Sequence, residues 1–139
     1  MTGKQLISQP LSMISTILEI ASSSLAASKE QLGYMEMAKE KPHMLDDAII
    51  SRSLKLYKEQ NENSTHYLRQ CKIWKQEQLN KLQLMQVEEV EDCTNKLIEV
   101  TNKLLAIFSY CQDHTINKIL GKDDMEFALD FLSGKIKLP

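Results

Sequence analysis

The sequence predicts an all-α fold, an antiparallel bundle of three long helices followed by a short C-terminal helix. Between His43 and Leu120 there is no glycine and no proline. Because these two residue types interrupt helices most strongly, the stretch is expected to be helical almost throughout. Its apolar residues recur at three- and four-residue spacing, so each helix needs a neighbour along its length. Blocks of lysine also alternate with blocks of carboxylates, the order expected where one helix ends and the next begins.

The first helix is predicted from Pro10, a residue suited to the first helical position, to about Lys39. Its apolar face passes Gly33, which favours one continuous helix over a stop at that glycine. The face consists of Leu11, Ile14, Leu18, Ala21, Leu25, Ser28, Leu32 and Met35.

The second helix is predicted to start after Pro42 and His43 and to end at about Leu84. Its apolar positions are Ile50, Leu54, Tyr57, Leu68 and Cys71. A polar interval over 58–65 separates them, with Asn61 and Ser64 on the core side. The alternative is a break near 61–64, where Ser64 would cap a new helix and the fold would become a four-helix bundle.

The third helix is predicted from about Val87 to Leu120 and has the clearest apolar stripe. The stripe consists of Val90, Cys93, Leu97, Val100, Leu104, Ile107 and Cys111, widened by Thr94, Ile98, Thr101, Leu105 and Phe108. Gly121 ends this helix, and Asp123 with Glu126 resembles the capping box of a short fourth helix over 124–133. That segment is apolar on nearly every side and is expected to dock on the bundle.

A single helix over 64–120 is the rival of this division, because the apolar pattern through Leu79, Leu82, Gln86 and Val90 is almost unbroken. A helix of that length would be covered along its side only in an elongated coiled-coil dimer.

Size and composition indicate one soluble helical domain over 1–139. The net charge of −2 and the absence of a basic patch argue against nucleic-acid binding. Three cysteines among apolar neighbours are expected to be reduced thiols in a cytoplasmic protein. The N-terminus lacks the basic region and uninterrupted apolar run of a signal peptide, and no segment is expected to span or bind a membrane.

No motif in the sequence predicts catalysis, a cofactor or a metal site, so the protein is not expected to be an enzyme. Its histidines form no Glu-x-x-His pair, which a di-metal bundle would require. Histidine phosphotransfer domains are helical bundles of similar size, and His114 is the nearest candidate for a phosphate acceptor. That family usually has lysine and then glycine three and four residues after the histidine, whereas this chain has Asn117 and Lys118.

The function that the sequence favours is protein–protein interaction, as an adaptor, a chaperone-like escort or an assembly subunit. Tyr57, Tyr67 and Trp74 lie on neighbouring turns of the second helix, and such aromatic residues are typical of binding hot spots. Burial against a neighbouring helix would account for them equally well. The first helix, which is poor in charge, is the second candidate contact surface, and the third helix is a candidate for homodimerisation.

Overall fold

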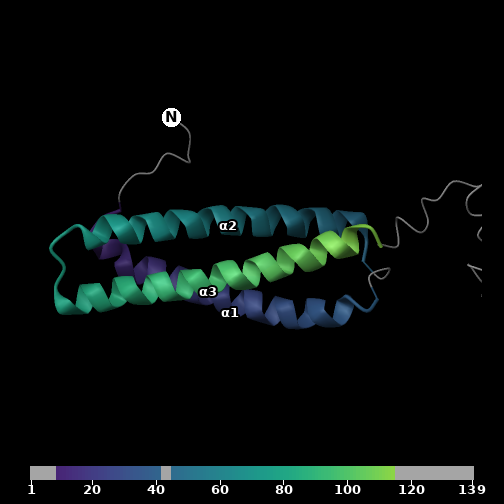
Figure 1. The fold of residues 1–139 in the computed structure, drawn as a ribbon, viewed down its shortest axis with the longest axis horizontal. Helices are drawn as coiled ribbons and strands as arrows, with labels where there is room; N and C mark the ends of the chain where they lie inside the picture. The colour runs from purple at the N-terminus through teal and green to yellow at the C-terminus, as the bar shows by residue number, and fades with distance from the viewer. Residues whose placement is uncertain (1–8, 42–44, 115–139) are drawn as a thin grey trace, which may run out of the picture.

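The computed structural model describes residues 9–41 and 45–114, which are mostly helical and contain no strand. Three helices pack against one another: α1 (Ile14–Ala38), α2 (Asp47–Lys75) and α3 (Lys81–Gln112). A short 3-10 helix, η1 (Leu11–Met13), leads into α1. The all-α prediction is therefore confirmed. Figure 1 shows the helices lying side by side as an elongated molecule.

Contacts between the helices define their directions. The first residues of α1 lie beside the end of α2, since the Trp74 indole Nε1 donates to the carbonyl of Gln9 at 2.9 Å. The end of α2 lies beside the start of α3, where the Cys71 thiol donates to the carbonyl of Val87. Successive helices therefore run in opposite directions (Figure 1).

The first two helices begin where the sequence predicts, and neither is interrupted. The helix α1 passes through Gly33 and ends at Ala38. The helix α2 starts after Asp46, whose carboxylate accepts a hydrogen bond from the Ile49 backbone N–H at 2.8 Å. It continues through residues 61–64, so the predicted alternative of a break there is wrong. The Ser64 hydroxyl donates to the Gln60 carbonyl within the helix instead of capping a new one.

The boundary between α2 and α3 differs from the prediction. The chain leaves α2 at Lys75 and enters α3 at Lys81, some turns before the predicted connection between Leu84 and Val87. A capping box explains the position: the Asn80 side chain accepts from the Gln83 N–H at 2.7 Å, and the Gln83 side chain accepts from the Asn80 N–H at 3.0 Å. The carboxylates 88–92 therefore lie inside α3. The single helix over 64–120 is also wrong, because the chain reverses at 76–80.

The end of α3 also differs from the prediction, because the helix ends at Gln112 and not at Leu120. The backbone N–H of His114 donates to the Cys111 carbonyl, a turn tighter than the four-residue helical repeat. A carboxylate at the following position, Asp113, is unfavourable at the negative end of a helix. The predicted fourth helix over 124–133 lies outside the described residues.

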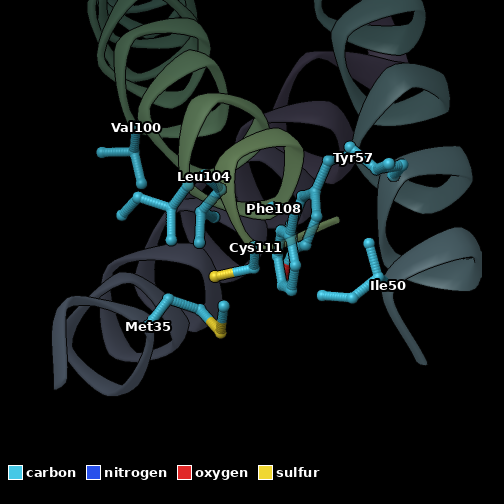
Figure 2. Packing of buried hydrophobic residues seen from close by; sticks show 9 residues of the cluster. Met35, Ile50, Tyr57, Val100, Leu104, Phe108 and Cys111 are labelled. Carbon is cyan, nitrogen blue, oxygen red and sulfur yellow. The ribbon is translucent and has the colours of Figure 1, made fainter. Parts of the chain in front are cut away.

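Two apolar clusters form the core, one towards each end of the bundle. The larger cluster is shown in Figure 2, where Phe108 of α3 points between Met35 of α1 and Ile50 and Tyr57 of α2. The Tyr57 and Phe108 rings stack with centroids 5.8 Å apart. The smaller cluster comprises Ile14, Ile17, Cys71, Trp74, Val87 and Val90.

A layer of buried polar side chains separates these clusters. The Gln60 amide Nε2 donates to the Ser28 hydroxyl at 2.9 Å and to the Thr101 hydroxyl at 2.8 Å, so one side chain of α2 joins α1 and α3. The Thr101 hydroxyl donates in turn to the Leu97 carbonyl. Ser64, which the sequence placed on the core side, is fully buried in the same region. This polar layer holds the three helices in one register.

Candidate functional site

The candidate site is a groove between α1 and α2. Both helices lie closely along α3, whereas their backbones approach each other at few points. A cavity of about 170 Å³ opens between them, with Leu97 of α3 at its base. Its lining comes from all three helices: Ile20 and Ser24 of α1, Leu56, Glu59, Gln60, Asn63 and Tyr67 of α2, and Leu97 of α3. We call this surface the α1–α2 groove.

Helical spacing explains why these residues share one surface. Leu56, Gln60, Asn63 and Tyr67 follow one another at four- and three-residue intervals, which places them on one face of α2. On α1, Ile20 and Ser24 are four residues apart and lie beside the buried residue Ile17. The groove therefore lies beside the core-facing stripe of each helix, at a place left uncovered because α1 and α2 make few direct contacts.

The lining of the groove mixes apolar and polar side chains. Ile20 is 44% exposed and Leu56 is 56% exposed, so a large aliphatic side chain from each of two helices is exposed to solvent at the opening. The Gln60 amide already donates to Ser28 and Thr101 in the polar layer beneath them. Partial burial raises the pKa of the Tyr67 hydroxyl, so this side chain is neutral at physiological pH. The groove therefore offers apolar contact and hydrogen-bonding groups, and Glu59 is the one acidic residue in its lining.

The three aromatic residues predicted for partner binding have different surroundings. Trp74 is fully buried in the smaller cluster, and Tyr57 is buried against Phe108. Both positions are those expected of core residues. Tyr67 is half-buried, packs against the smaller cluster and lines the α1–α2 groove. It is the member of the predicted set that lies at the candidate site.

Sequence analysis missed Ile20 and Leu56. Each falls just outside the apolar stripe of its helix, so periodicity classes it as an ordinary exposed side chain. The two residues line one opening because α1 and α2 make few direct contacts there, and no pattern within a single helix predicts this. The prediction of α1 as a contact surface nevertheless pointed to one wall of this groove.

The predicted phosphate acceptor, His114, is exposed just beyond the end of α3. Its ring lies 4.8 Å from that of Tyr110, measured between centroids. Asn117 and Lys118, where the chain departs from the phosphotransfer pattern, lie outside the described residues. Exposure makes the ring accessible, and the described residues around it supply one aromatic neighbour.

A second and larger cavity, of about 730 Å³, lies beside α2. Its lining mixes opposite charges and includes part of the predicted polar interval 58–65. The lining residues are Ser51, Leu54, Lys55, Lys58, Glu59, Glu62, Asn63 and His66 of α2 and Gln112 of α3. Among residues 9–41 and 45–114, no group of three histidine, cysteine or carboxylate side chains is arranged to hold a metal ion. This surface suits polar contacts with another macromolecule.

The cysteines differ in reactivity. Burial, with a smaller contribution from the nearby Glu91 carboxylate, raises the pKa of the Cys71 thiol to about 12. Burial also raises the pKa of the Cys111 thiol. Both thiols are therefore protonated and unreactive at neutral pH. Cys93 is partly exposed, and its Sγ lies 3.8 Å from the Ser22 hydroxyl.

Among the described residues, one helical segment, Leu11–Ala38, is long and apolar enough to span a membrane by length and composition alone. This finding differs from the sequence prediction, in which no segment is expected to span a membrane. In the fold, the same segment contributes Ile14, Ala21 and Met35 to the core.

Comparison of the chain with protein-family models, with curated proteins and with solved structures gave no match.

Proposed function

We propose that the chain is a protein-binding module, without catalytic activity, whose α1–α2 groove accepts an amphipathic helix of another protein. The observation that carries this proposal is that two exposed aliphatic side chains, Ile20 of α1 and Leu56 of α2, line one opening together with the buried Leu97 of α3. Apolar side chains arranged around a groove are a recurring mode of helix recognition.

The shape of the groove supports a helical ligand over a small molecule. Its lining residues run from Leu56 to Tyr67 along α2, about three helical turns, so the opening follows the helix. A ligand helix laid along it would place side chains at intervals of three, four and seven residues against Ile20, Leu56 and Tyr67. Since Glu59 is the only charged group lining the groove, burial of the contact would desolvate few charges.

The rigidity of the scaffold also favours binding. The hydrogen bonds of Gln60 to Ser28 and Thr101 fix the separation of α1 and α2 directly below the opening. A preformed groove loses less conformational entropy on binding than a surface that must order first. The proposed location remains the cytoplasm, where reduced Cys71, Cys93 and Cys111 would persist.

The proposal is tested with two matched substitutions, Leu56→Asp in the groove and Leu82→Asp at the start of α3. Both leucines are exposed, to 56% and 63%, so each substitution introduces the same charge at a similar position. Affinity purification from the native host, quantified by mass spectrometry, should recover a partner with the wild type and with Leu82→Asp. Recovery with Leu56→Asp should fall by roughly tenfold or more, which corresponds to the loss of one well-buried contact.

Equal recovery with both variants would overturn the groove as the binding site. Circular dichroism of each purified variant must show wild-type helix content, so that a loss of binding is not a loss of folding.

Homodimerisation through α3 is a second proposal, supported by three exposed apolar residues at the start of that helix: Leu82, Leu84 and Met85. If this patch joins two copies, Leu82→Asp should halve the solution mass measured by sedimentation, and Leu56→Asp should leave it unchanged. The reverse result would assign self-association to the groove.

A further inference from the structure

We propose that the chain's own C-terminal segment, residues 123–133, docks on the first half of α2 and covers that end of the α1–α2 groove. The surface concerned is formed by Ile49, Arg52, Lys55 and Leu56, which we call the basic face of α2. The inference rests on the proposed function, because the groove must be able to accept a helix. It identifies the C-terminal segment as a ligand that occupies the groove before any partner binds.

The basic face of α2 combines exposed apolar and cationic side chains. Ile49 is 41% exposed and Leu56 is 56% exposed. They lie seven residues apart, which places them on one side of the helix. Arg52 and Lys55 are also exposed, and no carboxylate occurs from Ala48 to Lys58, the next one being Glu59. Within the described part of the chain, no ion pair is formed by these two cations.

The C-terminal segment has the complementary composition. It carries four carboxylates (Asp123, Asp124, Glu126 and Asp130) and no base. Between them stand the large apolar residues Met125, Phe127, Leu129, Phe131 and Leu132. A segment this apolar gains free energy by leaving water, and its charges match those on the basic face of α2.

The segment is connected at the correct end of the bundle. Cys111, in the last turn of α3, belongs to the same cluster as Ile50 in the first turn of α2 (Figure 2). Residues 115–122 remain as a connection. At about 3.3–3.6 Å per extended residue, such a connection spans roughly 25 Å, more than twice the diameter of a helix. The segment can therefore cross the end of the bundle and reach Ile49 and Leu56.

Docking of this kind would make the segment an intramolecular competitor of any partner helix. A ligand tethered by a short connection acts at an effective concentration in the millimolar range. A partner must then exceed this competition before it occupies the groove, so access would depend on the charge and exposure of the C-terminal segment.

Photo-cross-linking of the full chain tests the inference. Benzoylphenylalanine replaces Leu56 in one protein and, as a matched control, Asn95 in another. Asn95 is exposed and lies two residues from Leu97, on the opposite side of α3 from the base of the groove. After illumination and digestion with trypsin, the probe at position 56 should be joined to the peptide 123–135. Its yield should exceed that from position 95 by roughly tenfold, as expected for a tethered ligand.

Two further variants test the chemistry of the contact. Arg52→Glu with Lys55→Glu should lower the cross-link yield at position 56 several-fold, whereas Lys72→Glu with Lys81→Glu, an equal charge change elsewhere, should not. Phe131→Asp should also lower it. Helix content measured by circular dichroism confirms that each variant is folded.

A mixture of unlabelled and ¹⁵N-labelled chains identifies the source of the segment. Cross-links only between peptides of the same isotope support docking within one chain. Mixed-isotope cross-links would overturn the inference in favour of a second copy, and absence of the 123–135 peptide would overturn it outright. In both cases recovery of a partner by the wild type and not by Leu56→Asp would still support the proposed function, so the two failures are distinguishable.

Discussion

Gln60 joins the three helices at one point, because its amide donates to one hydroxyl on α1 and to another on α3. Both acceptors are buried, with Ser28 2% exposed and Thr101 fully buried. Sequence analysis placed Asn61 and Ser64 on the core side of the polar interval but missed Gln60. Its backbone lies beside the core stripe, and only the length of the side chain brings the amide inside. Residue types with long polar side chains are usually exposed, so periodicity alone does not identify such a position.

The polar layer predicts opposite results from single and combined substitutions. Gln60→Leu leaves the Ser28 and Thr101 hydroxyls buried without their donor, and it should lower the free energy of unfolding by about 1–3 kcal/mol. The combination Gln60→Leu, Ser28→Ala and Thr101→Val removes all partners together and should restore much of that loss. Urea unfolding followed by circular dichroism measures both. Equal destabilisation by the single and triple variants would contradict a role for unsatisfied buried groups.

The boundaries of the helices depend on side-chain hydrogen bonds at their ends. The start of α2 was predictable because Asp46 follows closely after Pro42, and a carboxylate is a strong N-cap. The connection at 76–80 lies earlier in the chain than the alternating charge blocks predict. Asn80 followed three residues later by Gln83 is the sequence pattern that marks the true start of α3. A capping box fixes a single residue, whereas helix-dipole preferences extend over a whole turn.

Asn80→Ala tests this cap. Loss of the side-chain acceptor should lower the free energy of unfolding by about 1 kcal/mol, since two backbone N–H groups at the start of α3 depend on the box. Asn80→Asp keeps an acceptor at the same position and should be close to neutral. The midpoints of urea unfolding give both values. A loss as large with aspartate as with alanine would show that the cap is not what stabilises the turn.

The whole molecule has two apolar clusters linked by the polar layer, and every helix contributes to both clusters. The bundle was predictable because the apolar spacing within each helix is regular. The groove was not, because it lies where α1 and α2 make few direct contacts, and their spacing depends on side-chain volumes from all three helices. The sequence therefore predicts the buried face of each helix better than it predicts which residues at the edge of that face stay exposed.

Leu104→Ala tests whether the clusters unfold together. Leu104 is fully buried in the larger cluster, so its truncation should lower the free energy of unfolding by about 2–5 kcal/mol. Trp74, the only tryptophan, lies in the smaller cluster and reports on the other end of the bundle. Tryptophan fluorescence and circular dichroism should shift to the same new midpoint. Separate midpoints would show that the chain is not one cooperative unit. Lys103→Ala, at the exposed neighbouring position, should leave both signals nearly unchanged.

The connection at 76–80 has one more consequence. It contains no glycine or proline, so only the capping box and the packing of α3 on α2 oppose its conversion into helix. If residues 76–80 became helical in two chains, α3 of each chain could pack against α1 and α2 of the other. It would then make the same contacts that it makes within its own chain. The fold thus carries a built-in route to domain swapping, one that concentrated refolding would favour and that a glycine in the hinge would suppress.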